Sequence, residues 1–217
     1  MKIFLDTADT SLIQKHFATG LIDGITTNPT LIRKSGRDPL EVYQELKDLG
    51  VPDISMEVVG DADEMIKEGG ALSLTFGKCC TVKVPCSPDG LRTCKELSDA
   101  GIRVNVTLIF SQTQAILAAK AGAAYVSPFV GRVDDNSFGG LCLVKDIAKV
   151  FKEHMVRTEV LAASVRDVRS VGRAFEYGAD IVTMPPTVFE KMYNHILTDK
   201  GLELFQADYE AVLGINS

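Results

Sequence analysis

The sequence lacks the features that mark metal sites and disulfide frameworks. It has five cysteines and three histidines, and no two cysteines form a C-x-x-C pair. The cysteines stand at positions 79, 80, 86, 94 and 142, far from the histidines along the chain. A zinc site or a set of disulfides is therefore not expected, and reduced thiols in the core fit the pattern better.

Long apolar runs and basic clusters are missing as well. No apolar run approaches the ~20 residues of a membrane span, and the N-terminal MKIFLDTADT turns polar too early for a signal peptide. The net charge is −6 without a basic run to offset it, which argues against a nucleic-acid partner. An anionic substrate stays compatible, because a few local arginines suffice to hold it. We expect a soluble cytoplasmic protein that binds neither membrane nor nucleic acid.

The chain also contains no proline- and serine-rich linker, no charge block and no low-complexity tract. Its 217 residues, 46% hydrophobic and 24% charged, are typical of a soluble protein with a substantial core. We expect a single domain over residues 1–217, in which residues 198–217 form a helical extension.

Short apolar runs alternate with helical patterns along the whole chain. Between these runs, segments such as PLEVYQELKDLG and LVKDIAKVFKEHM have apolar residues at three- and four-residue spacing. The predicted strands are residues 2–6, 23–27, 54–59, 81–85, 103–109, 124–128, 159–164 and 180–185.

About eight strand–helix units in roughly 215 residues favour an α/β fold of the (β/α)8 TIM-barrel type. A doubly wound open sheet is the alternative. Such a sheet usually has a glycine-rich phosphate loop after its first strand, and LDTADT contains no glycine. A final segment, LELFQADYEAVLG, predicts an additional C-terminal helix that either closes a barrel end or reaches a neighbouring subunit.

Polar residues gather on one face of the predicted strands, near their C-terminal ends. Side chains alternate between the two faces of a strand, so Lys83 points away from the side taken by Val82 and Val84. The same rule turns a further set of polar residues inward: Asp6, Ser55, Glu57, Thr81, Asn105, Thr107, Ser127 and Ser164. Barrel enzymes carry their chemistry at this end, so these residues are a candidate active site.

Lys83 is the most informative residue of the set, because it interrupts a buried strand. Burying an ammonium group costs several kcal/mol unless the group is paired or loses its proton. A neutral amine can attack a carbonyl to form a Schiff base, which acts as an electron sink when a neighbouring carbon–carbon bond breaks. The alternative is a structural lysine that is ion-paired with Glu57 or Asp6.

Taken together, these residues resemble the transaldolase family, in particular its short-chain branch, which includes the fructose-6-phosphate aldolases. The motifs are FLDTAD at 4–9, GITTNPTLI at 24–32, SMEVV at 55–59, VKVP at 82–85, NVTLIFS at 105–111, YVSPFVGR at 125–132 and AASVR at 162–166. Each motif is weak alone, but they follow in the family order and cover essentially the whole chain. The resemblance implies a class I aldolase-type barrel over residues 1–217, acting without a metal or an organic cofactor.

The resemblance also implies a role for each matching residue. Lys83 matches the Schiff-base lysine, Asp6 matches the acid/base carboxylate, and Glu57 and Thr107 match the pair that holds a catalytic water. The implied substrate-binding positions are Thr26, Asn28, Asn105, Ser127, Phe129, Arg132, Ser164 and Arg166. Within this set, the groups matched to the dihydroxyacetone hydroxyls are Asn28, Asn105 and Ser127, and those matched to phosphate are Arg132, Ser164 and Arg166.

Two positions separate the branches of the family. Fructose-6-phosphate aldolases usually have glutamine at the position of Glu57 and tyrosine at the position of Phe129, and this sequence has the residues of transaldolases. The resemblance therefore implies transfer of a dihydroxyacetone unit between sugar phosphates in the non-oxidative pentose phosphate pathway. An aldolase that releases dihydroxyacetone is the alternative. A non-enzymatic sugar-phosphate-binding barrel is a third hypothesis, disfavoured because Lys83, Asp6 and Glu57 are all present.

The C-terminal segment bears on assembly. The short-chain branch tends to form rings of five subunits, sometimes stacked in pairs, so the resemblance implies a homo-oligomer, either a pentamer or a decamer. Leu202, Phe205, Tyr209 and Leu213 recur at helical spacing, which suits a helix that reaches a neighbouring subunit. Packing of this helix on its own barrel is equally compatible with the sequence.

Overall fold

The computed structural model describes residues 1–214 and contains a closed barrel of strands in sequential order, β1 to β8. All neighbouring strands are parallel. The strands are β1 (Lys2–Asp6), β2 (Gly24–Thr26), β3 (Ile54–Glu57), β4 (Cys80–Pro85), β5 (Val104–Ile109), β6 (Tyr125–Pro128), β7 (Glu159–Ala162) and β8 (Ile181–Met184). The predicted (β/α)8 barrel is confirmed, and the open-sheet alternative is wrong.

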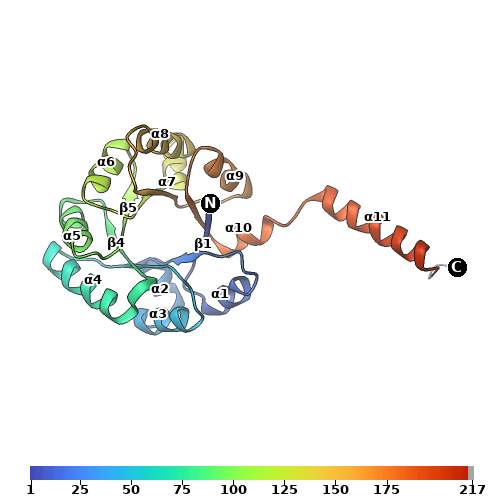
Figure 1. The fold of residues 1–217 in the computed structure, drawn as a ribbon, viewed down its shortest axis with the longest axis horizontal. Coiled ribbons are helices and arrows are strands. Elements are labelled where there is room, and N and C mark those ends of the chain that lie inside the picture. Colours follow the sequence, from blue (N-terminus) through green and yellow to red (C-terminus); the bar gives the residue numbers. More distant parts are fainter. Residues whose placement is uncertain (215–217) are drawn as a thin grey trace.

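The helices form a ring around the barrel, with the exception of the last one (Figure 1). They are α1 (Thr10–Phe17), α2 (Pro29–Ser35), α3 (Pro39–Asp48), α4 (Ala62–Phe76), α5 (Pro88–Asp99), α6 (Gln112–Lys120), α7 (Val130–Asp135), α8 (Gly140–Glu153), α9 (Val168–Glu176), α10 (Pro186–Lys191) and α11 (Ile196–Leu213). A short 3₁₀ turn, η1 (Gly77–Cys79), precedes β4. None of the described helices combines the length and the apolar character needed to cross a membrane.

Many helices begin at a residue whose side chain caps the first turn. Asp9, Asn28, Ser87 and Asp167 each accept a hydrogen bond from a backbone N–H of the helix that follows. Asp61 forms a reciprocal capping box with Glu64 at the start of α4. These caps satisfy backbone donors that the first turn leaves without a partner, so each of these helices begins directly after its capping residue.

The core consists of two layers separated by the strands. Val82 and Val84 are fully buried on the outer side of β4. Val82 lies so close to Gly69 of α4 that a Cβ at Gly69 would come within 2.9 Å of its side chain. Inside the barrel, a second cluster comprises Phe4, Tyr125, Leu161, Ala163 and Ile181. The predicted alternation of faces is therefore confirmed for β4.

Strand β5 departs from regular pairing near its C-terminal end. Its register with β6 shifts between Val106 and Ile109, and Leu108 lies there in the left-handed region, with φ at 60°. A left-handed backbone is costly for a residue with a Cβ. The irregularity adjoins Thr107, which lines the cavity described below.

The N-terminal end of the barrel is closed by a hydrogen-bonded carboxylate, Asp53. Its Oδ1 accepts a hydrogen bond from Thr81 Oγ1 at 2.8 Å. Its Oδ2 accepts hydrogen bonds from Arg103 at 2.8 Å and from the Tyr125 hydroxyl at 2.6 Å. Burial and the neighbouring Asp53 raise the pKa of Tyr125. This end of the barrel is a satisfied polar network.

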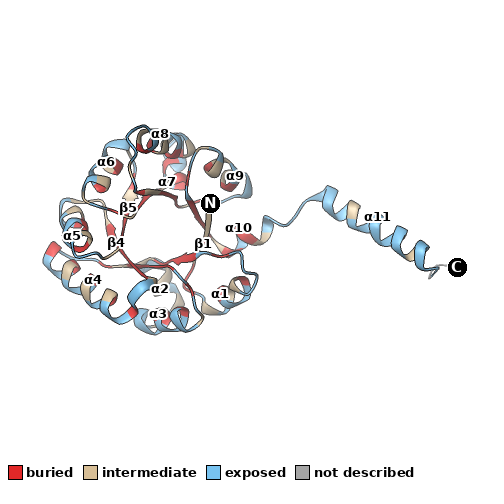
Figure 2. Ribbon diagram, in the orientation of Figure 1, coloured by how far each residue is buried: buried red, intermediate tan, exposed pale blue. Residues whose placement is uncertain are grey.

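Helix α11 projects away from the barrel (Figure 1), and none of its residues is buried (Figure 2). It begins at Ile196, two residues before the predicted extension at 198–217, and residues 215–217 of that extension lie outside the described residues. Phe205 is 70% exposed and Tyr209 is 61% exposed. The prediction of an additional helix is confirmed, and in this structure it does not pack on its own barrel.

Candidate active site

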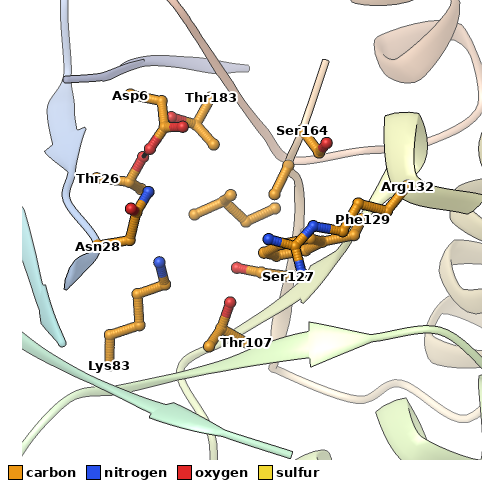
Figure 3. Close-up of a pocket in the computed structure, with 12 residues that line it drawn as sticks. Asp6, Thr26, Asn28, Lys83, Thr107, Ser127, Phe129, Arg132, Ser164 and Thr183 are labelled. Atoms are coloured by element: carbon orange, nitrogen blue, oxygen red, sulfur yellow. Dashed lines mark hydrogen bonds between the residues drawn. The ribbon is translucent and has the colours of Figure 1, made fainter. Parts of the chain in front are cut away.

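A cavity of about 130 Å³ opens at the C-terminal end of the strands (Figure 3). Most of the predicted site residues line it, and they come from different strands and the loops that follow them. The lining residues are Asp6, Thr26, Asn28, Lys83, Thr107, Ser127, Phe129, Arg132, Leu161, Ala163, Ser164 and Thr183. The structure therefore brings together side chains that lie far apart in the sequence, from Asp6 to Thr183.

Lys83 extends into this cavity from β4 and is only 5% exposed. Its Nζ donates a hydrogen bond to the backbone carbonyl of Thr27 at 3.0 Å. The same nitrogen lies 2.9 Å from Glu57 Oε2 on the adjacent strand β3, where Glu57 and Lys83 are direct register partners. The ion pair with Glu57 that the sequence left open is present, and it holds the amine beside a proton acceptor.

Asp6 ends β1 on the other side of the cavity. Its Oδ1 accepts a hydrogen bond from Thr26 Oγ1 at 2.8 Å, and Thr26 in turn lies 2.7 Å from the Thr183 hydroxyl. Burial raises the pKa of Asp6, and the charge of Lys83 and the hydrogen bond from Thr26 only partly oppose the effect. Asp6 is thus a carboxyl group that binds a proton more tightly than an exposed aspartate, which makes it the stronger base of the two.

Glu57 and Thr107 each present a buried oxygen without a hydrogen-bond partner among the described residues. The atoms are Glu57 Oε2 and Thr107 Oγ1. Glu57 Oε2 does have a charged neighbour, the Lys83 ammonium at 2.9 Å. Glu57 does not line the cavity itself and lies instead at a groove between α3 and α4, together with Tyr43. Buried oxygens without partners are rare in native proteins and call for a ligand or a water molecule.

Asn105 lies behind the cavity wall and is fully buried. Its side-chain amide donates a hydrogen bond to Ser55 Oγ at 3.2 Å and accepts one from Ser127 Oγ at 2.7 Å. Ser127 lines the cavity and Asn105 does not. Asn105 was predicted to bind the hydroxyls of the dihydroxyacetone unit, and in this structure its amide is bonded to Ser55 and Ser127.

The predicted phosphate residues lie on the side of the cavity formed after β6 and β7. The Arg132 guanidinium stacks over the Phe129 ring at 5.1 Å from its centroid. Ser164 lines the cavity in a left-handed conformation, with φ at 58°. Arg166 does not line the cavity, because both of its terminal nitrogens donate to Asp135, each at 2.6 Å.

Sequence reasoning missed two threonines of the site. Thr183 on β8 lines the cavity, and the alternation rule that singled out Lys83 would have found it. Thr27 contributes only its backbone carbonyl to Lys83, and no rule about side chains reveals such a contact. Within residues 1–214, no three His, Cys, Asp or Glu side chains are arranged so that they could hold a metal ion.

Comparison with known proteins agrees with this geometry. A family model described as Transaldolase/Fructose-6-phosphate aldolase matches residues 3–215. A protein named "Probable transaldolase" from Caulobacter vibrioides is 52% identical over 210 residues, which cover 96% of each chain. Proteins of the same name from Cereibacter sphaeroides and Paracoccus denitrificans are each 51% identical over 210 residues, which cover 96% of this chain and 95% or 96% of the relative.

Proposed function

This chain belongs to the Transaldolase/Fructose-6-phosphate aldolase family, and we propose that it is a transaldolase that works through a Schiff base on Lys83. It moves a dihydroxyacetone unit from a ketose phosphate, such as sedoheptulose 7-phosphate or fructose 6-phosphate, to an aldose phosphate. The acceptor is glyceraldehyde 3-phosphate or erythrose 4-phosphate. The observation that carries the proposal is a buried lysine in a polar cavity at the C-terminal end of the barrel, with a carboxyl group on either side.

The first half of the reaction begins at the ketone of the donor. The ammonium of Lys83 passes a proton to Glu57, 2.9 Å away, and the free amine attacks the ketone carbon. Loss of water from the adduct leaves a protonated imine. Asp6 takes the proton of the hydroxyl on the fourth carbon, the bond between the third and fourth carbons breaks, and its electron pair moves toward the imine.

The second half of the reaction runs the same steps in reverse. The shortened aldose leaves and the acceptor aldehyde takes its place. The three-carbon enamine attacks the aldehyde carbon, and Asp6 returns its proton to the new hydroxyl oxygen. Water then adds to the imine and releases the product ketose. The raised pKa of Asp6 suits this alternation between base and acid.

A water held between Glu57 and Thr107 takes part in the formation and the hydrolysis of the imine. Both residues have a buried oxygen that accepts no hydrogen bond from the residues the structure describes, which supports this assignment. Thr26, Asn28, Ser127 and Phe129 line the cavity and would surround the three-carbon unit, and Asn105 would join them through its hydrogen bond with Ser127.

The phosphate is assigned to Arg132, Ser164 and Arg166, because a guanidinium donates two parallel hydrogen bonds to phosphate oxygens. Arg166 joins this set only after it has exchanged Asp135 for the substrate.

Borohydride trapping tests the proposal directly. Reduction in the presence of fructose 6-phosphate should add one dihydroxyacetone-derived group, which mass spectrometry should locate on Lys83. The wild-type protein should form products only when erythrose 4-phosphate or another acceptor is present. The absence of an adduct would refute the Schiff base, and an acceptor-independent rate would favour the dihydroxyacetone-releasing aldolase.

The proposal extends to assembly and setting. The exposed apolar residues of α11, among them Leu202 and Phe205, support a homo-oligomer in which this helix packs on a second copy, with the family expectation of a pentamer or decamer. We place the protein in the cytoplasm, in the non-oxidative pentose phosphate pathway. Light scattering with and without residues 198–217 tests the role of the helix, because the truncated chain should be smaller than the full assembly by more than the mass removed.

A further inference from the structure

We propose that the backbone carbonyl of Thr27 is the permanent hydrogen-bond acceptor of the Lys83 nitrogen throughout catalysis, and that the Thr27 and Tyr43 side chains position it. The inference rests on the proposed Schiff-base function and adds to it a group that touches the reacting nitrogen. Thr27 follows β2 directly and is fully buried.

Lys83 Nζ has two protein neighbours of different kinds. The Thr27 carbonyl accepts its hydrogen bond at 3.0 Å. Glu57 Oε2 lies at 2.9 Å in an ion pair. The carbonyl is therefore a neutral hydrogen-bond acceptor of this nitrogen, whereas the carboxylate is a charged neighbour that pairs with it only while the nitrogen carries a proton to share.

The Thr27 carbonyl is held rigidly by its own residue. The backbone N–H and the side-chain hydroxyl of Thr27 both donate to the Ser55 carbonyl, at 3.2 and 3.0 Å. The Tyr43 hydroxyl, from α3, lies 3.2 Å from Thr27 Oγ1. If the Thr27 proton is directed to Ser55, the Tyr43 hydroxyl donates in this second contact, and in either direction the contact ties Thr27 to α3. Burial raises the pKa of Tyr43, so that its hydroxyl keeps this proton.

The next residue fixes the other side of the same peptide group. Asn28 caps α2 by accepting a hydrogen bond from the Leu31 N–H at 3.0 Å. Its backbone carbonyl accepts one from Ile32 at 3.0 Å. The peptide between Thr27 and Asn28 is thus held from β3, from α3 and from α2.

The chemistry explains why a carbonyl suits this position. Once the imine has formed and is protonated, the nitrogen retains a single N–H, which needs one acceptor in the plane of the imine. A carboxylate that exchanges protons during the cycle is a variable acceptor, whereas an amide carbonyl stays neutral at every step. A fixed acceptor keeps the imine protonated and oriented, and preorganised groups of this kind lower the barrier without reorganisation.

Thr27→Val tests the positioning role, because it removes the hydroxyl and keeps the shape. We expect kcat to fall about tenfold, and the yield of borohydride adduct on Lys83 to fall with it, while KM changes by less than about twofold. Thr27→Ser retains the hydroxyl and should restore most of the activity. Tyr43→Phe should act in the same direction with a smaller effect.

Thr158→Val is the matched control. Thr158 is also buried, and its hydroxyl donates to the Ala123 carbonyl at 2.8 Å at the opposite end of the barrel. Both valine variants should lose similar thermal stability, but only Thr27→Val should change kcat and trapping. Equal kcat and trapping in the two variants would overturn the inference. Failure of the proposed function would look different, because wild type itself would then give no adduct on Lys83.

Discussion

The two ends of strand β3 each carry a carboxyl group, with Asp53 just before the strand and Glu57 as its last residue. Asp53 accepts hydrogen bonds from Thr81, Arg103 and Tyr125. Glu57 Oε2 accepts none from the described residues, although it lies close to Lys83. The same strand therefore begins beside a satisfied polar network and ends beside Lys83, the lysine that extends into the cavity.

This contrast separates stability from chemistry within one barrel. A fully connected polar network rigidifies its surroundings, whereas a buried oxygen without a partner costs free energy in the absence of a ligand. We therefore expect substitutions at the N-terminal end to lower the free energy of unfolding while turnover is kept. Substitutions at the cavity should lower turnover and leave stability unchanged or higher.

The largest effect is expected for Lys83→Met. Removal of the nucleophile should lower turnover by at least about a thousandfold, because no other group on the cavity wall can form the imine. Steady-state assays measure the loss, and circular dichroism checks the fold. Lys2→Met is the control, because it removes an ion pair with Glu159, at 2.7 Å, from the other end of the barrel. Turnover near the wild-type level in Lys83→Met would contradict the assignment of the chemistry to the cavity.

The opposite outcome is expected for Asp53→Asn. An amide cannot accept all the hydrogen bonds that Thr81, Arg103 and Tyr125 donate, so the free energy of unfolding should fall by about 2–3 kcal/mol. Urea denaturation measures this loss, and kcat at 25 °C should stay close to that of wild type. A stable Asp53→Asn variant with reduced kcat would reverse the assignment of the two ends.

Asp6→Asn tests the contrast through the pH dependence of stability. The pKa of Asp6 is raised by burial, so the folded state binds a proton more tightly than the unfolded chain, and stability falls as pH rises from about 3.9 through the raised pKa. Asparagine has no charge to bury, so the variant should melt at a higher temperature than wild type at neutral pH, and the gap should close below about pH 3.9. Turnover should be lost. A lower melting temperature at neutral pH would contradict the expected sign.

The smallest effects come from a matched pair of threonines. Thr81→Val removes a hydroxyl that donates to Asp53 and should cost about 1–2 kcal/mol without changing kcat. Thr107→Val removes a hydroxyl without a partner among the described residues and should not lower the melting temperature, while kcat falls. Calorimetry measures the melting temperature of both variants, and steady-state assays measure their kcat. Equal losses of stability would contradict the proposed difference between the two ends of the barrel.

The barrel could be predicted from the sequence because its signals are local. Apolar runs of period two, helical patterns between them and polar residues at strand ends such as Asp6 and Lys83 all occur within a few residues of one another. The strand ends deviate by up to two residues, as in β3, which ends at Glu57 and not at residue 59. Boundaries of this kind depend on pairing with neighbouring strands, which the local pattern does not contain.

Parts of the candidate site depend on contacts that no local pattern encodes. The Thr27 carbonyl meets Lys83 across 56 positions of the chain. Asn105 was expected at the substrate; it is level with Lys83 in the register of β4 and β5, and its amide is bonded to Ser55 and Ser127, contacts with other strands that its own segment does not reveal. Arg166 was expected at the phosphate and pairs with Asp135, a residue 31 positions away that no local pattern links to it.

Helix α11 has a consequence for how the molecule becomes ordered. A single helix of 18 residues without a buried side chain is only marginally stable in water. If a second copy covers it, its order follows mass action, and dilution loosens the helix while the barrel stays folded. Folding of the barrel would then be independent of protein concentration, whereas the order of α11 would depend on it.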